Sequence, residues 1–164
     1  MLQPGDEAPD FEARRRDGSA VRLSALHCRF VLVYFYPKDN TPGCTAEACS
    51  LNDHLGDLGS SGAEVIGVSV DSQEAHQRFQ ERHGLGFALA SDKDRAISGA
   101  YGVGRMLGIL PMARRSSFLV GPDGRVVETW PSVSPREHAE EVLVAVRRHR
   151  AAAPAASGRS DAVR

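Results

Sequence analysis

The chain has 164 residues and a formal net charge of −1 at pH 7, with 41% hydrophobic and 25% charged residues. This length and composition suit one globular domain with its own core. The near balance of charges argues against nucleic acid or an anionic membrane as the main partner. The N-terminus has no basic region followed by an apolar stretch, and no apolar run approaches the roughly 18 residues that span a bilayer. We therefore expect a cytoplasmic protein that does not cross a membrane.

The cysteine content points to a reducing compartment. The chain has three cysteines, Cys28, Cys44 and Cys49. An odd, small number without a secretion signal does not suggest a structural disulfide framework. In a reducing compartment a disulfide is usually transient and functional, so we expect any disulfide of this chain to belong to its activity.

The first strands are predicted from turn signals and apolar runs. Residues 11–15 and 20–23 flank Asp17-Gly18, which is a strong hairpin signal. The apolar run over 30–36 predicts a buried strand, and the β-rich run over 64–70 predicts another. These segments supply an N-terminal β-hairpin and two strands of a core sheet.

Two helices are predicted between and after these strands. The first begins at Pro42 and ends near Gly59 or Gly62. A second helix is expected over 72–83, with Ser72 as its N-cap and Gly84 as its stop. The apolar positions of the first helix are Ala46, Cys49, Leu51 and Leu55.

The second half of the chain completes an α/β pattern. It predicts a short strand over 87–90 and a short helix over 94–101. A hairpin follows, with strands over 116–120 and 125–130 around Pro122-Asp123-Gly124, and a final helix over 135–150 is capped by Ser134. The pattern indicates a layered α/β domain over 1–150, with a mixed sheet that is parallel through the crossovers and antiparallel at the hairpin. Residues 151–164 are rich in Ala, Ser and Pro, and we expect a disordered tail there.

The start of the helix at Pro42 is suited to an activated thiol. Thr41 is a good N-cap and Pro42 fits the first helical position, so Cys44 falls in the first turn, beside unpaired N–H groups and the positive end of the helix dipole. Both features favour the thiolate, which is the reactive form. Making an ordinary cysteine mostly thiolate at neutral pH takes about 3.4 kcal/mol, and a helix N-terminus supplies about 0.3–1, or up to roughly 2 when partly buried. A nearby cation is therefore expected.

Two arginines can supply this cation. Arg114 and Arg115 lead directly into the apolar strand over 116–120. Because side chains alternate between the faces of a strand, only one of the two can reach the thiol.

Cys49 lies five residues after Cys44 on the same predicted helix. In a regular helix their Cα atoms are about 8.7 Å apart, whereas a disulfide rarely spans more than about 7 Å. The two cysteines can bond only if residues 42–50 unwind.

At this point the sequence resembles a known family. Pro37-x-x-x-Thr41-x-x-Cys44 resembles the active-site signature of the peroxiredoxins, and Tyr-Pro-Lys-Asp-x-Thr-Pro-Gly-Cys-Thr-x-Glu-Ala-Cys over 36–49 resembles the bacterioferritin comigratory protein, or Q-type, subfamily. The resemblance runs from about residue 5 to residue 148 and implies a thioredoxin-like fold with a central mixed sheet flanked by helices. Further matches, in the family order, are Gly-Asp-x-Ala-Pro-Asp-Phe at 5–11, His83-Gly84-Leu85-x-Phe87 with Ser91-Asp92, Tyr101-Gly102-Val103, and Arg115-x-Ser117-Phe118.

The resemblance implies a thiol peroxidase that reduces hydrogen peroxide or organic hydroperoxides. By this pattern Cys44 is the peroxidatic thiolate, and Thr41 and Arg115 hold the peroxide and stabilise charge as its O–O bond breaks. Pro37 shields the sulfenic acid that forms on Cys44, and Glu47 orients Arg115 through an ion pair.

The resemblance also implies how the cycle closes. Cys49 is the resolving thiol, which gives an intramolecular disulfide with Cys44, and a thioredoxin-type dithiol reductant restores both thiols. No cofactor or metal is needed. An internal resolving thiol removes the chemical need for a partner subunit, so we expect a monomer. Two features depart from the family pattern: Cys28 is extra, and residues 104–113 match poorly.

Three other functions compete with this interpretation. A protein disulfide oxidoreductase usually presents Cys-x-x-Cys, whereas here the spacing is Cys-x-x-x-x-Cys. A metal-binding module would have to use Cys28, Cys44, Cys49 and His54, whose spacings do not match the usual zinc patterns. A non-catalytic scaffold would not need the full set of motif residues. The six histidines show no ligand spacing and are expected at the surface or at helix caps: His27, His54, His76, His83, His138 and His149.

Overall fold

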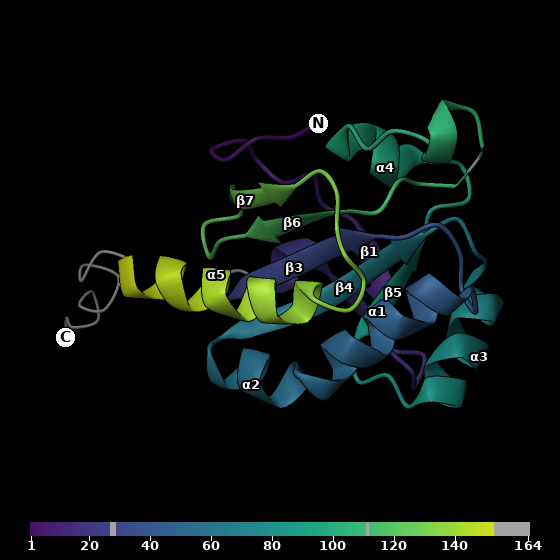
Figure 1. The fold of residues 1–164 in the computed structure, drawn as a ribbon, viewed down its shortest axis with the longest axis horizontal. Coiled ribbons are helices and arrows are strands. Elements are labelled where there is room, and N and C mark those ends of the chain that lie inside the picture. The colour runs from purple at the N-terminus through teal and green to yellow at the C-terminus, as the bar shows by residue number, and fades with distance from the viewer. Residues whose placement is uncertain (27–28, 111, 153–164) are drawn as a thin grey trace.

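The computed structural model describes residues 1–26, 29–110 and 112–152. Its centre is a seven-stranded sheet in the order β2-β1-β5-β4-β3-β6-β7 (Figure 1). The strands are β1 (Glu12–Arg14), β2 (Ala20–Arg22), β3 (Phe30–Phe35), β4 (Ala63–Ser69), β5 (Ala88–Ser91), β6 (Ser116–Val120) and β7 (Val126–Trp130).

Helices cover both faces of this sheet. In Figure 1, α1, α2 and α3 lie on the lower side of the sheet and α4 lies on the upper side. Within the described ranges, no helix is both long enough and apolar enough to cross a membrane. The helices are α1 (Pro42–Asp53), α2 (Leu55–Ser60), α3 (Gln73–His83), α4 (Ala96–Tyr101) and α5 (His138–Ala152), with short 3-10 helices η1 (Leu23–Leu26) and η2 (Met106–Gly108).

The predicted mixed sheet is confirmed. β3 pairs in parallel with β4, and β4 with β5, through crossovers, while β3 pairs with β6, β6 with β7, and β1 with β2 in antiparallel fashion. β3 is buried along its whole length and divides the core. Leu32 and Tyr34 belong to the hydrophobic cluster beneath α1, α2, α3 and α5, whereas Val33 and Phe35 belong to the cluster on the α4 side.

The structure corrects three helix boundaries. The helix predicted from Pro42 to near Gly59 or Gly62 is broken at His54 into α1 and α2. The His54 amide is shared between the carbonyls of Ser50 and Leu51, and its ring nitrogen Nδ1 also lies 2.9 Å from the Ser50 oxygen, so the regular helical bonding pattern ends there. The last helix begins at His138 rather than at residue 135, and it includes residues 151–152, which were assigned to the tail. Residues 153–164 lie outside the described residues.

The buried face of α1 also differs from the prediction. Ala46 and Cys49 are only half-buried, and the buried stripe consists of Cys44, Glu47, Ala48 and Leu51, at helical spacings of three and four residues. Hydrophobicity alone could not select this stripe, because one of its members is a carboxylic acid.

Candidate active site

The segment between β3 and α1 positions the helix start. Pro37 is buried directly after the strand, and Thr41 occupies the N-cap position with extended backbone angles (φ −82°, ψ 153°). The Thr45 amide donates to the Thr41 carbonyl at 2.8 Å and so opens the helix. Contrary to the expectation from sequence, the Thr41 hydroxyl caps no amide and donates instead to the Lys38 carbonyl at 3.1 Å. This arrangement leaves the lone pairs of the hydroxyl oxygen available to a ligand.

Cys44 is buried at this helix start and faces a guanidinium group. Nη2 of Arg115 donates to the Cys44 Sγ at 3.4 Å, and Cys44 is only 1% exposed. Arg115 reaches the site because the antiparallel pairing of Ser116 with Phe35 places the start of β6 beside the end of β3. The preceding residue, Arg114, is exposed, as the alternation of a strand requires.

Glu47 holds the guanidinium from the other side. Nη1 of Arg115 donates to Glu47 Oε1 at 2.7 Å, and the Glu47 side chain is fully buried. Burial raises the pKa of Glu47 to about 7, although the charge and hydrogen bond of Arg115 act to lower it. Burial acts to lower the pKa of Arg115, but Cys44 and Glu47 outweigh it, so this pKa lies above its ordinary value. The guanidinium therefore stays cationic beside the sulfur.

Arg115 lies directly against Gly43. A Cβ atom at Gly43 would lie 3.2 Å from Nη2 of Arg115, which is closer than ordinary contact. A side chain at this position would therefore require Arg115 to shift by a few tenths of an ångström.

The structure brings some predicted site residues together and keeps one apart. Cys44, Glu47 and Arg115 form a contiguous set, and Pro37 and Thr41 lie on the segment leading into the same helix turn. Cys49 is a free, half-buried thiol outside the buried stripe of an intact α1. Cys28 lies outside the described residues.

A second polar cluster, not predicted from the sequence, consists of Asp39, Asp71 and His76. Asp39 and His76 are almost completely buried. One carboxylate oxygen of Asp39, one of Asp71 and a ring nitrogen of His76 all lie within 4.8 Å of one another. His76 was expected at the surface; instead it shares the buried stripe of α3 with Phe79. That spacing of three residues from a buried aromatic was the signal that could have revealed it. His138 was also expected at the surface and is buried.

Among the described residues, this cluster is the group whose donor atoms approach metal-ligand geometry, and it includes neither cysteine. Its donor atoms are already engaged: His76 contacts Asp39 and the Ala90 carbonyl, and Asp71 accepts from Ser69 and from a backbone amide. Hydrogen bonds within the protein thus account for this cluster without an ion.

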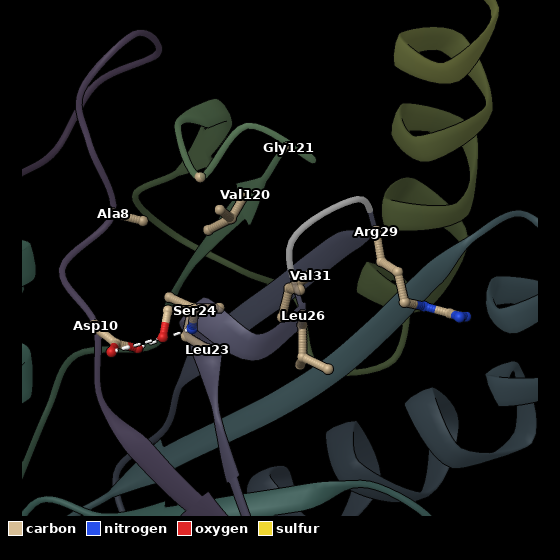
Figure 2. Close-up of a pocket in the computed structure, with 10 residues that line it drawn as sticks. Ala8, Asp10, Leu23, Ser24, Leu26, Arg29, Val31, Val120 and Gly121 are labelled. Carbon is tan, nitrogen blue, oxygen red and sulfur yellow. Dashed lines mark hydrogen bonds between the residues drawn. The ribbon is translucent and has the colours of Figure 1, made fainter. Parts of the chain in front are cut away.

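The cavity drawn in Figure 2 lies away from Cys44. It is lined by Val31 and Val120, which belong to the core cluster on the other face of the sheet. The Asp10 carboxylate accepts from the Ser24 amide and hydroxyl at its edge, both at 2.9 Å. Its volume of about 30 Å³ suits water rather than an organic ligand.

Comparison with known proteins agrees with this geometry. Residues 4–129 match the model of the AhpC/TSA family. The chain is 37% identical to peroxiredoxin Bcp of Bacillus subtilis, over 87% of this chain and 93% of that protein. It is 36% identical to peroxiredoxin Bcp of Escherichia coli, over 90% and 97% of the two chains.

Solved structures show the same fold. A mutant of PrxQ from Xylella fastidiosa superposes with a TM-score of 0.83 at 34% identity, over 91% of this chain and 98% of that one. The bacterioferritin comigratory protein of Xanthomonas campestris superposes with a TM-score of 0.80 at 34% identity, over 90% and 99% of the chains. The expected thioredoxin-like peroxiredoxin fold is thereby confirmed, and the chain belongs to the AhpC/TSA family of peroxiredoxins.

Proposed function

We propose that this thiol peroxidase reduces peroxides at Cys44, with Arg115 and Thr41 binding the peroxide and Cys49 resolving the oxidised sulfur. The observation that carries this assignment is the contact of Arg115 Nη2 with Cys44 Sγ at 3.4 Å, in a guanidinium that Glu47 fixes at 2.7 Å. A cation held in place next to a buried sulfur is already positioned for the negative charge that develops on the departing peroxide oxygen.

In the first step the Cys44 thiolate attacks one oxygen of the peroxide. The S–O bond forms with the sulfur's electron pair while the O–O bond breaks, and the leaving oxygen departs as an alkoxide or hydroxide that takes up one proton. Sulfur is oxidised to a sulfenic acid, and the peroxide is reduced to an alcohol or water. Arg115 stabilises the departing oxygen, and the Thr41 hydroxyl, which donates to Lys38, accepts a hydrogen bond from the peroxide's own O–H group.

Pro37 is assigned to the wall of this pocket. It is buried between the end of β3 and the helix start. Because proline has no backbone N–H group, it cannot donate a hydrogen bond to the oxygen of the sulfenic acid. The carboxylate of Glu47 keeps the guanidinium in place while the sulfur changes charge.

In the second step the Cys49 sulfur attacks the Cys44 sulfenic acid. The S–S bond forms, the S–O bond breaks, and the oxygen leaves as water after taking the thiol proton. Because α1 is helical through both positions and a regular helix keeps their Cα atoms about 8.7 Å apart, the first turns of α1 must unwind before the bond can form.

In the third step a dithiol reductant, such as a thioredoxin, returns both cysteines to thiols and leaves with its own disulfide. Reduction by an external dithiol requires a reducing compartment, which supports the assignment to the cytoplasm. An internal resolving thiol supports a monomer, because the cycle needs no second subunit. The X. campestris relative was studied for alkyl peroxide reduction, which supports organic hydroperoxides as substrates alongside hydrogen peroxide.

The alternative function, exchange of disulfides in other proteins, is not favoured. Cys44 is 1% exposed, so a small peroxide can approach its sulfur far more readily than a disulfide embedded in a folded protein. The attack of a thiolate on a disulfide requires access to the sulfur along the S–S axis.

The test is mass spectrometry after one equivalent of peroxide. We expect a Cys44–Cys49 bridge in the unmodified chain, a persistent sulfenic acid in Cys49→Ser, and loss of peroxide consumption in Cys44→Ser. Cys28→Ser is the matched control and retains the Cys44–Cys49 bridge. A bridge to Cys28 or between two chains would overturn the assignment of Cys49.

A further inference from the structure

The buried cluster around Asp39 lies on the segment that carries Pro37 and Thr41. Asp39 is only 6% exposed, and both of its carboxylate oxygens are bound. Oδ1 accepts from the Tyr36 hydroxyl at 2.6 Å, and Oδ2 lies 2.8 Å from Nδ1 of His76 on α3. The Asp39 amide donates to Asp71 Oδ2 at 2.8 Å. Asp39 is thus tied to α3, to the loop after β4 and to Tyr36 at the start of its own segment.

The partners of Asp39 are themselves fixed to the sheet. The Ser69 hydroxyl, at the end of β4, donates to Asp71 Oδ2 at 2.7 Å, and the Ser91 hydroxyl of β5 donates to the Asp71 carbonyl at 2.6 Å. Nε2 of His76 lies 3.0 Å from the Ala90 carbonyl, also on β5. The contacts of Asp39 therefore extend to the two strands on the side of β3 away from Arg115.

The hydrogen bonds of His76 fix how many protons the pair holds. The Ala90 carbonyl can only accept, so Nε2 must carry a hydrogen. The 2.8 Å contact between Nδ1 and Asp39 Oδ2 then requires a second hydrogen, carried by either the ring or the carboxyl group. Without that proton two acceptors would face each other in a buried place, at a cost.

Tyr36 joins the Asp39–His76 pair to the core that contains the thiol. Tyr36, which donates to Asp39, stacks on Tyr34 with ring centroids 5.3 Å apart. Both rings belong to the same buried cluster as Cys44. The other charged group at the cluster is Lys38, 4.0 Å from Asp71 Oδ1 and exposed.

We propose that Asp39 and His76 are positioning residues for peroxide reduction: their one-proton contact holds the segment of Pro37 and Thr41 in place against the thiol. The proposal rests on the proposed function of Cys44. It adds that the peroxide pocket is held from the α3 side by this pair, independently of the Glu47–Arg115 contact on the other side. Loss of the pair shifts Thr41 and so slows the attack on peroxide, and it leaves the attack by Cys49 unchanged, because that step uses an unwound α1.

The variants Asp39→Ala and Asp39→Asn separate positioning from a general effect of the substitution. The oxygen of asparagine can accept the hydrogen bond from Tyr36, and its NH2 group can donate to Nδ1 of a neutral His76 ring. Asparagine therefore restores both side-chain contacts of Asp39 without the proton that the Asp39–His76 pair shares. Alanine restores none. His149→Gln, which removes a histidine paired with Glu128 on the surface, is the control.

Two rates are measured by rapid quenching and mass spectrometry: formation of the Cys44 sulfenic acid and formation of the Cys44–Cys49 bridge. In Asp39→Ala we expect the first rate to fall by about tenfold to 10²-fold, the loss that a misplacement of about 1 Å can cause, with the second rate unchanged. Asp39→Asn recovers most of the first rate, and His149→Gln keeps both. Circular dichroism establishes that each variant is folded at the temperature of the assay.

Three outcomes would overturn the proposal. These are an unchanged first rate in Asp39→Ala, an equal loss in both steps, or an Asp39→Asn variant as slow as Asp39→Ala. Should Asp39→Ala fail to fold, His76→Leu supplies the comparison: it loses the contacts with Asp39 and with the Ala90 carbonyl, and it should slow the first rate while leaving the second unchanged. The proposed function fails separately, when the unmodified chain forms no sulfenic acid at Cys44.

Discussion

The two chain segments that flank Cys44 are held very differently. Before it, the segment from β3 to the helix start is tied by Asp39 to α3 and to the loop after β4. After it, α1 contributes four buried residues out of twelve, and its first turn contains Gly43, a poor helix former. A helix of this length is marginal without tertiary packing. The first side of the thiol is therefore anchored by hydrogen bonds, whereas the second depends on one packed stripe and the Glu47–Arg115 contact and is the more weakly held.

This difference matches the two demands of the chemistry proposed above for Cys44 and Cys49. Attack on peroxide needs the pocket residues in fixed positions. Formation of a bond between residues five apart needs the helix to open. A protein that anchored both segments would reduce one peroxide and then stall, whereas one that anchored neither would bind peroxide poorly. The asymmetry lets a single short stretch of chain serve both steps.

The largest expected effect comes from removing the cation that contacts the thiol and Glu47. Arg115→Met keeps the aliphatic stem but loses the donors to Cys44 and Glu47. The rate of sulfenic acid formation should fall by about 10²–10³-fold, the usual loss when one donor to a developing negative charge is removed. Stopped-flow measurement of peroxide consumption checks this value.

Arg114→Met is the matched control, because Arg114 is the adjacent residue and is exposed. It should leave the rate unchanged. Equal losses in both variants would mean that the net positive charge near the pocket matters rather than the contact with Cys44. Arg115→Lys should recover only part of the rate, since an ammonium cannot contact Cys44 and Glu47 through a planar fork.

Much of this arrangement could be predicted from sequence. The Thr41-Pro42 signal placed Cys44 in the first helical turn, and an estimate of helix-dipole energy required a cation. Strand alternation reduced the choice to one of two arginines, and the resemblance to the peroxiredoxins selected Arg115. The layered α/β fold followed from turn signals and apolar runs. These inferences succeeded because they depend on local backbone chemistry.

Contacts between distant elements could not be predicted in this way. His76 and Asp39 are 37 positions apart, and a histidine on its own gives no sign of the carboxylate that will face it. The buried stripe of α1 could not be predicted because Glu47 interrupts the apolar pattern, and its partner Arg115 comes from the distant segment before β6. The break at His54 coincides with a contact between its ring and the Ser50 carbonyl, which composition does not reveal.

The next effect concerns pH and the weakly held side. Burial raises the pKa of Glu47 from 4.5 to about 7, so the folded chain keeps a proton that the unfolded chain releases. Glu47 therefore favours folding fully below about pH 4.5, and this contribution is lost as pH rises through about 7. At roughly 1.4 kcal/mol per pKa unit the loss reaches about 3 kcal/mol. Relative to the unmodified chain, Glu47→Gln should become more stable as pH rises through this window.

Urea unfolding at the two ends of this pH window measures the change. The comparison is made in a Cys44→Ser background, so that titration of the thiol does not contribute. Glu74→Gln, a substitution in the first turn of α3, controls for the loss of one carboxylate. If the stability difference between the Glu47→Gln variant and its parent stays constant with pH, Arg115 keeps Glu47 ionised throughout, and the ion pair stabilises this side more than we infer.

The smallest effect tests the asymmetry itself, through amide exchange in the reduced and oxidised chain. A Cys44–Cys49 bridge cannot form on a regular helix, because the Cα separation of about 8.7 Å exceeds the roughly 7 Å limit. Oxidation should therefore speed exchange over residues 42–50 by at least about tenfold, equivalent to ~1.4 kcal/mol of local opening. Exchange in α3 and at the Asp39 amide should not change.

Cys49→Ser is the control, since it is oxidised at Cys44 without forming a bridge and should keep its protection. Equally slow exchange over 42–50 in both states would contradict a helix that unwinds, whereas faster exchange at Asp39 as well would mean that the anchored side opens together with it.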